Sequence, residues 1–323
     1  MLYEAAYPAL YVGAKFHQIA RRFKARIGKA PADMARVTYN PDSYYRVTCW
    51  RLRRIDIELM MLVAPTRAAR IAIERFERTK PLPARTSFET KTDDAETKDI
   101  TYGGRNIHMR FYGPEAGPKI LAVHGWNGRA SMLRKMVYAL AIEGYRVIVP
   151  DLPGHGQSDG NRFSFYDLGQ ALADLFEDTS FEAVIGHSAG GLITGIAIGR
   201  GLKSACYIPI AAPSSLDNLL KSYVEIAQMP ERSLPFISRY YTRRYGIPPN
   251  DVGPTLIASL DVRTLVIHET NDWQVGVENA EQLAEAARDG ELFLTTGFTH
   301  LSVLNAPEVH TQITGFITRG QDA

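Results

Sequence analysis

The chain has 323 residues, of which 45% are apolar and 22% are charged, and its formal net charge is +2. This composition excludes disordered, collagen-like and disulfide-scaffold proteins, and the length allows a large core in one or two domains. The two cysteines, Cys49 and Cys206, have no metal-binding or redox spacing, which favours a cytoplasmic protein. No apolar run reaches the roughly 18 residues of a membrane-spanning helix, so we expect the protein to be soluble.

The charges divide unevenly along the chain. Residues 1–85 carry 17 Lys and Arg against 7 Asp and Glu, a balance of +10, and the remainder carries 20 against 28, a balance of −8. Pro81 and Pro83 stand close to this step. We therefore predict a basic helical extension over 1–84 and a second domain over 85–323.

Three helices are predicted in the extension, at 4–27, 42–62 and 66–78, each separated from the next by proline. A basic amphipathic layer is suited to peripheral contact with an anionic membrane, to binding of an acidic partner or to self-association. The alternative is a helical layer that packs on the second domain and leaves its basic face in water. We favour the alternative, because runs of charge usually lie at the surface, but the pattern leaves both open.

The second domain begins with a predicted hairpin at 100–112, around Gly103 and Gly104. Strands and helices then alternate to the end of the chain. In order, they are strand 119–125, helix 131–144, strand 145–151, helix 166–176, a strand that ends before residue 188 with a helix after it, strands 205–213 and 264–270, helix 277–287, strand 292–296 and helix 306–318. Such alternation predicts an α/β fold with a mainly parallel sheet, helices on both faces and a site at the carboxyl ends of the strands.

Residues 214–258 interrupt this alternation between two predicted strands. The segment is rich in proline and in aromatic residues, among them Tyr223, Phe236, Tyr240 and Tyr241. We predict that it forms a small helical cap over the sheet.

The pattern Gly-x-Ser-x-Gly occurs twice, in "GHSAG" around Ser188 and in "GQSDG" around Ser158. This pattern is typical of a turn between a strand and a helix. The turn is so sharp that the serine adopts a strained backbone conformation. Only Ser188 has an apolar strand before it and a helix-period segment after it. We therefore predict that Ser188 is a nucleophile and that Ser158 is a loop residue.

A serine nucleophile requires backbone donors for the oxyanion that develops during acyl transfer. The N–H of Ala189 follows the predicted turn and opens the next helix. The segment "LAVHGWNG" ends an earlier strand, and the N–H of Trp126 is the best placed to face Ala189. The predicted oxyanion hole consists of Trp126 and Ala189.

The serine also requires a base, and the base requires an acid that orients it. Asp272 in "ETND" and His300 in "GFTH" follow two later strands, which gives the order Ser, Asp, His. We predict His300 as the base and Asp272 as the acid. Glu269 stays open as an alternative acid, and His187 is expected to have a structural role beside the serine.

Other polar residues near the predicted strand ends are interpreted as loop-ordering groups, namely His124, Asp151 and His155. No cluster of His, Cys and carboxylates has metal-ligand spacing. The segment "GGLITG" lacks the Lys and the Ser or Thr that a phosphate-binding loop needs at its end. We expect no metal and no cofactor.

The motifs "HGWNG", "DLPGHGQSDG", "GHSAGG", "ETND" and "GFTH" together resemble serine hydrolases of the α/β-hydrolase superfamily, over about residues 85–320. Within it they look most like the bacterial branch related to monoacylglycerol lipases and serine aminopeptidases. The resemblance implies the α/β-hydrolase fold, Ser188 as nucleophile, His300 as base, Asp272 as acid, and Trp126 with Ala189 as oxyanion donors. It implies nothing about the extension over 1–84.

The expected reaction is hydrolysis of a small carboxylic ester with a short to medium acyl chain, with no nucleic-acid partner. One alternative is a peptidase or amidase with the same triad, in which Glu225 and Glu231 of the cap would bind a substrate amine. The other is a non-catalytic protein of the same fold that binds a partner or docks on a membrane through its basic helices.

Overall fold

A computed structural model describes residues 59–79, 95–226 and 229–319 of the chain. The predicted helix at 4–27 lies outside the described residues, as does most of the helix predicted at 42–62. The predicted domain boundary at residue 84 also lies outside them and stays a prediction.

The described residues divide into two compact units. The smaller contains residues from 59–72 and 221–237, and the larger contains 73–220 and 238–319. The end of the third predicted helix therefore belongs to the same unit as the sheet, although the sequence analysis assigned it to the extension. In the described ranges we find no helix with the length and hydropathy that a bilayer crossing requires.

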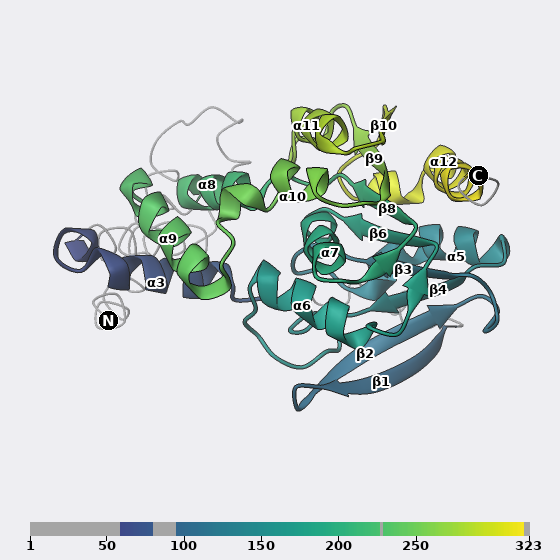
Figure 1. Cartoon of the computed structure of the whole chain (residues 1–323), viewed down its shortest axis with the longest axis horizontal. Helices are drawn as coiled ribbons and strands as arrows, with labels where there is room; N and C mark the ends of the chain where they lie inside the picture. Colours follow the sequence, from purple (N-terminus) through teal and green to yellow (C-terminus); the bar gives the residue numbers. More distant parts are fainter. Residues whose placement is uncertain (1–58, 80–94, 227–228, 320–323) are drawn as a thin grey trace, which may run out of the picture. The chain divides into compact units, whose positions relative to one another are not determined.

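The larger unit is built on an eight-stranded sheet with the order β1-β2-β4-β3-β6-β8-β9-β10 (Figure 1). The strands are β1 (Glu96–Tyr102), β2 (Arg105–Tyr112), β3 (Lys119–Val123), β4 (Arg146–Pro150), β6 (Ala183–His187), β8 (Cys206–Ile210), β9 (Arg263–Glu269) and β10 (Gly290–Thr295). β2 runs antiparallel to β1 and β4, and all other neighbours are parallel. The prediction of a mainly parallel α/β fold is confirmed.

The burial of the strands explains their sequences. β4, β6 and β8 are buried along their whole length, which matches the continuous apolar runs of parallel strands that are covered on both faces. The predicted hairpin is confirmed between β1 and β2, where Gly103 and Gly104 have φ of 54° and 73°. Both values suit a two-residue turn that requires left-handed backbone at both positions. A pair of two-residue strands, β5 (Ser180–Phe181) and β7 (Lys203–Ser204), was not predicted.

Helices cover both faces of the sheet. The described part of the chain contains the helices α3 (Pro65–Phe76), α5 (Arg134–Ile142), α6 (Phe165–Leu175), α7 (Ala189–Gly199), α8 (Leu216–Ile226), α9 (Leu234–Tyr245), α10 (Pro254–Ala258), α11 (Glu278–Ala286) and α12 (Pro307–Thr318), of which α3, α8 and α9 lie partly in the smaller unit. Alternate residues of one strand meet different layers: Leu265 and Ile267 of β9 join the core of α5 and α12, and Val266 joins that of α10 and α11. The two cores therefore lie on opposite faces.

The segment predicted as a cap is helical, because it contains α8, α9 and α10. Its residues are shared between the two units, since 221–237 belong to the smaller one. Its placement over the sheet stays a prediction.

Candidate active site

Ser188 stands alone between the end of β6 and the start of α7. It has φ 54° and ψ −127°, a left-handed conformation that is rare for a residue with a side chain. Its N–H donates to the carbonyl of Ile210 (2.8 Å), and its carbonyl accepts from the N–H of Gly191 (2.9 Å). Ser188 is half-buried, and its hydroxyl does not cap α7. Two hydrogen bonds thus fix the backbone of Ser188, while its hydroxyl is not used to cap the helix.

The glycines of the motif are required by close approach. A Cβ built on Gly186 would collide with the carbonyl of Gly190, and one built on Gly190 would lie 2.6 Å from the carbonyl oxygens of Val123 and His124. Any side chain at these positions would push α7 away from β3 and β6. The motif therefore allows the start of α7 to lie against the end of β3.

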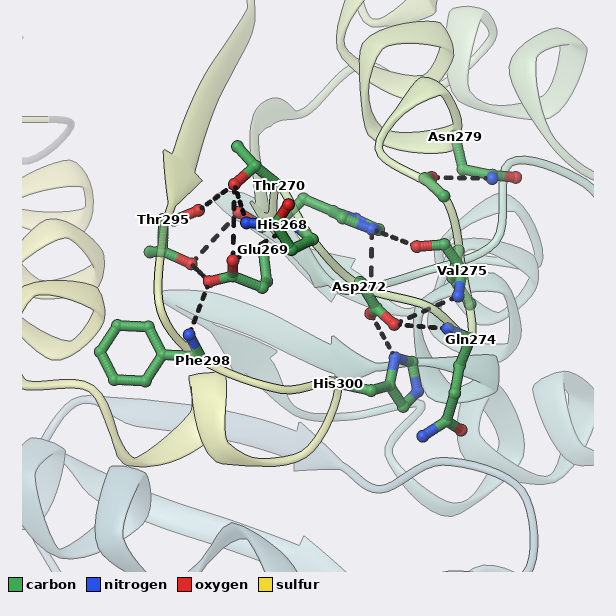
Figure 2. A network of polar contacts seen from close by, with 12 residues as sticks. His268, Glu269, Thr270, Asp272, Gln274, Val275, Asn279, Thr295, Phe298 and His300 are labelled. Atoms are coloured by element: carbon green, nitrogen blue, oxygen red, sulfur yellow. Dashed lines mark hydrogen bonds and ion pairs between the residues drawn. The ribbon is translucent and has the colours of Figure 1, made fainter.

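The predicted acid and base meet at the ends of β9 and β10. The Nδ1 of His300 donates to the Oδ2 of Asp272 at 2.6 Å, and the Oδ1 of Asp272 accepts from the N–H groups of Gln274 (2.8 Å) and Val275 (3.2 Å) (Figure 2). Asp272 is buried, so its carboxylate is held by three donors instead of water. This arrangement leaves the Nε2 of His300 as the nitrogen that can accept a proton.

His187 connects the serine turn to the base. Its Nε2 donates to the backbone carbonyl of His300 at 2.8 Å, and the two ring centroids are 4.9 Å apart. Burial, and then the neighbouring His300 ring, lower the pKa of His187 to about 3, so its imidazole is neutral near pH 7. The residue next to Ser188 therefore contacts the residue predicted to activate it. In the described structure no hydrogen bond joins the Ser188 hydroxyl to His300 itself, a contact that is often long in enzymes without substrate.

The loop after β3 carries the second predicted oxyanion donor. The carbonyl of Gly125 accepts from the Nδ1 of His124 (2.8 Å) and from the N–H of Gly128 (3.0 Å). The Nε2 of His124 accepts from the N–H of Leu152 (3.1 Å), which places the ring proton on Nδ1. Burial lowers the pKa of His124 and keeps this ring neutral.

These bonds set the direction of the next peptide group. A trans peptide is planar, so the N–H of Trp126 points opposite to the Gly125 carbonyl that His124 holds. A Cβ built on Gly125 would lie 3.0 Å from the Cβ of Ser188, which brings the loop beside the turn. In the part of the chain that the structure describes, neither the N–H of Trp126 nor that of Ala189 donates a hydrogen bond. Both N–H groups remain available to an oxyanion.

A family model described as "Alpha/beta hydrolase family" matches residues 120–310. The match covers more than half of the chain and includes every residue of the candidate site. The chain belongs to the alpha/beta hydrolase family. The chain also resembles known proteins over shorter stretches and in fold.

Over 86 residues, a quarter of its length, this family member is 45% identical to the magnesium-chelatase 30 kDa subunit of Rhodobacter capsulatus, and the match spans 30% of that protein. A protein named as a lipase from Acinetobacter baumannii AYE has the same fold, with a TM-score of 0.59, 17% identity and coverage of 75% of this chain and 99% of that one. The esterase RhEst1 from Rhodococcus sp. ECU1013 gives a TM-score of 0.52, with 19% identity, 69% of this chain and 98% of that one. Identities this low show the fold alone.

Glu269, which the sequence left open as an alternative acid, has other partners. Its Oε2 accepts from the hydroxyl of Thr295 (3.0 Å) and the N–H of Phe298 (3.1 Å), and its Oε1 accepts from the N–H of Asn271 (3.2 Å) (Figure 2). Burial alone would raise the pKa of Glu269, but these hydrogen bonds lower it below its usual value. Glu269 orders the ends of β9 and β10 and makes no hydrogen bond to His300 in the described structure.

His268 is a polar residue of the site that the sequence analysis missed. It is fully buried in β9, its Nε2 donates to the carbonyl of Val275 (2.9 Å), and the same nitrogen is 3.9 Å from the Oδ2 of Asp272. It therefore supports the loop that holds the acid. A histidine inside an otherwise apolar strand, four residues before Asp272, is the signal that could have indicated it.

The second copy of the serine motif lies in a loop that is ordered by Asp151. The side chain of Asp151 accepts from the N–H groups of Ala130 (2.6 Å) and Gln157 (2.9 Å), and the hydroxyl of Ser158 donates to the carbonyl of Asp151 (2.6 Å). Nearby, the Nδ1 of His155 donates to the carbonyl of Pro153 at 3.0 Å. The interpretation of these residues as loop-ordering groups agrees with their contacts. Among the described residues, no three His, Cys, Asp or Glu side chains are grouped as a metal site requires.

Proposed function

We propose that this chain is a serine hydrolase that cleaves carboxylic esters with short to medium acyl chains. The proposed triad is Ser188, His300 and Asp272. The observation that carries the proposal is the imidazole of His300 bound to Asp272, on a residue whose backbone carbonyl accepts a hydrogen bond from His187, the neighbour of the strained Ser188.

In the first step, the Oγ of Ser188 attacks the ester carbonyl carbon and the Nε2 of His300 takes the hydroxyl proton. The tetrahedral oxyanion accepts hydrogen bonds from the N–H groups of Trp126 and Ala189. His300 then gives its proton to the leaving alkoxide, and the carbon–oxygen bond to the alcohol breaks. An acyl group remains on Ser188.

Deacylation repeats these steps with water. His300 removes a proton from a water molecule while the oxygen of that water attacks the acyl carbon. It then returns the proton to the Oγ of Ser188 as the carboxylic acid product departs. Asp272 keeps the Nδ1 proton in place and stabilises the imidazolium in both steps. The loss of one oxyanion donor typically lowers turnover about 100- to 1000-fold, so the two N–H groups matter as much as the base.

Two features support the proposed substrate class: the aromatic segment 214–258 and the resemblance of the motifs to the monoacylglycerol lipase branch. An aromatic cap without a carboxylate cluster favours an uncharged acyl group. The amidase alternative would use Glu225 and Glu231, both of which are exposed to solvent. Exposed carboxylates bind a substrate amine weakly, because water screens the charge.

The proposal is tested by covalent labelling with a fluorophosphonate, by peptide mapping of the labelled site, and by turnover of a panel of p-nitrophenyl esters. The wild-type protein is expected to be labelled at Ser188 and to hydrolyse short and medium esters fastest. Ser188→Ala should lose both the labelling and the turnover, because the nucleophile is absent.

Ser158→Ala is the matched control, since it removes the serine of the other Gly-x-Ser-x-Gly copy. It should keep labelling and turnover even if the loop around Asp151 is less stable. Retained turnover in Ser188→Ala would exclude the triad, and faster cleavage of aminoacyl p-nitroanilides than of esters would replace the esterase by the amidase.

A further inference from the structure

The last turn of α3 and the residues after it belong to the unit that carries the sheet. α3 ends at Phe76. The N–H of Thr79 donates to the carbonyl of Asn161 (2.9 Å), and the N–H of Phe163 donates to the carbonyl of Glu77 (3.1 Å). These two backbone bonds attach the end of the helix to the loop that precedes α6.

A buried carboxyl group anchors the same turn. Glu77 is 5% exposed, and its Oε1 accepts a hydrogen bond from the hydroxyl of the fully buried Tyr241 in α9 (3.2 Å). The Nε of Arg162 lies 3.7 Å from its Oε2. Phe76 is therefore next to a residue that is held by backbone and side chain together.

The ring of Phe76 stacks on two aromatic residues of the sheet unit. It lies 6.1 Å from the indole of Trp126 at an angle of 11°, and 6.0 Å from the ring of Phe165 at 9°. Trp126 and Phe165 are themselves 5.2 Å apart at 8°. The three rings are thus nearly parallel to one another, with centroid distances in the range of interacting aromatic pairs.

His155 contacts the same indole from another direction. Its ring meets Trp126 edge-on, with centroids 5.2 Å apart at 78°, and its Nδ1 is fixed on the carbonyl of Pro153. Parallel contacts from Phe76 and Phe165 and a perpendicular contact from His155 together restrict the indole. Of these residues, Phe76 comes from the helix that precedes the part of the chain matched by the family model.

We propose that Phe76 is a positioning residue for the oxyanion hole: by stacking on the indole of Trp126 it holds the backbone N–H of residue 126 toward the reacting carbonyl. The inference rests on the proposed function, in which that N–H is a donor. A restricted side chain limits the backbone torsions of its own residue. Catalysis is sensitive to such restriction, because a displacement of about 1 Å at a reacting group can lower the rate about 100-fold.

A role in transition-state binding differs measurably from a role in folding. Phe76→Ala should lower kcat about tenfold, because a donor that is misplaced, but not lost, weakens transition-state binding. KM should stay within about twofold, because the donor acts mainly on the oxyanion. Phe76→Tyr keeps the ring and should retain kcat within about twofold, whereas Phe76→Leu keeps apolar volume without a planar ring and should behave like Phe76→Ala.

An alkylboronic acid supplies a second readout. The Oγ of Ser188 would add to its trigonal boron and pass the hydroxyl proton to His300, which gives a tetrahedral adduct with an oxygen in the oxyanion hole. Its affinity should fall in Phe76→Ala by the same factor of about ten as kcat, because the adduct resembles the transition state.

Phe176→Ala is the matched control, because it also removes one ring of an aromatic pair, with Phe181 at 5.4 Å, but at the end of α6 away from residue 126. It should lower the unfolding midpoint and leave kcat and boronic acid affinity unchanged. Unchanged kcat in Phe76→Ala, or equal kcat loss in both alanine variants, would overturn the role of Phe76 while the esterase assignment stood. A wild-type protein without fluorophosphonate labelling would overturn both.

Discussion

Ser188 combines a functional side chain with a costly backbone. A non-glycine residue at φ 54° and ψ −127° is strained by contacts of its Cβ with the backbone, at a cost of about 1–3 kcal/mol. The surrounding structure enforces this conformation, since the N–H and the carbonyl of Ser188 both have backbone partners. Activity and stability therefore oppose each other at this residue.

Ser188→Gly should be more stable than Ser188→Ala by about 1 kcal/mol. Alanine keeps the Cβ and the strain, whereas glycine removes both, and the larger entropy of glycine in the unfolded chain offsets part of the gain. Urea unfolding of the two inactive variants measures the difference. Equal free energies of unfolding would show that the turn stores no strain.

His187 is predicted to act through one nitrogen. In His187→Gln the amide nitrogen occupies the position of Nε2 and can still donate to the carbonyl of His300, whereas in His187→Asn it occupies the position of Nδ1 and cannot. We expect kcat for a p-nitrophenyl ester to fall about tenfold in the Asn variant and to stay within about threefold in the Gln variant. Only the Asn variant loses the hydrogen bond that holds the backbone of His300.

The two amide variants control each other, since both replace the ring by a neutral amide. Circular dichroism should show the same sheet content in both. Equal losses of kcat would indicate that the ring itself, through its contact with His300, is what matters.

At the scale of elements, Glu77 connects α3 with α9. Desolvation by burial is the main reason that its pKa rises from 4.5 to about 7, and the nearby Asp167 carboxylate adds to the rise, while the Tyr241 hydrogen bond and two arginines oppose it. Between these pH values the folded protein holds a proton that the unfolded chain has released. The free energy of unfolding therefore falls as pH rises from about 4.5 to about 7.

Glu77→Gln should remove this dependence. Glutamine can still accept a hydrogen bond from the Tyr241 hydroxyl, and it has no charge to desolvate. The free energy of unfolding of the variant at pH 8 should therefore exceed that of the wild type by up to about 3 kcal/mol. The advantage should shrink toward pH 5. Urea unfolding at both pH values measures it.

Glu74→Gln provides the matched control, because it removes a partly exposed carboxylate one turn earlier in α3, whose Oε1 is 3.5 Å from Arg162. It should not reproduce the gain at pH 8. A Glu77→Gln variant that is less stable than the wild type at pH 8 would mean that the carboxylate contributes more through its partners than burial costs.

The elements themselves were largely predictable. The buried runs of β3, β4, β6 and β8 and the glycine pair of the hairpin are local signals, and the structure contains all of them. The helix predicted at 131–144 begins instead with a 3₁₀ turn over Ala130–Leu133 before α5. The strands β5 and β7 were missed because two residues are too few to show a period.

At the scale of the whole molecule, the site is collected from strand ends that are distant in sequence. Trp126 follows β3, Ser188 follows β6, Asp272 follows β9 and His300 follows β10. Because these strands are parallel within one sheet, their carboxyl ends meet at the same edge (Figure 1). The topology thus places the four residues after strand ends at one edge of the sheet, although they are far apart in the sequence.

By itself, the sequence determined the α/β layout and the identity of the strained serine. Both depend on local physics: apolar runs that must be buried on two faces, and a sharp turn in which only glycine fits two residues before and two residues after the nucleophile. The tertiary structure decided which side chains support the site. His187 donates to residue 300, 113 positions away, and Tyr241 donates to Glu77 across 164 positions. Such pairs arise only when elements pack, because no periodicity in the chain encodes which ring or carboxyl group will be opposite another.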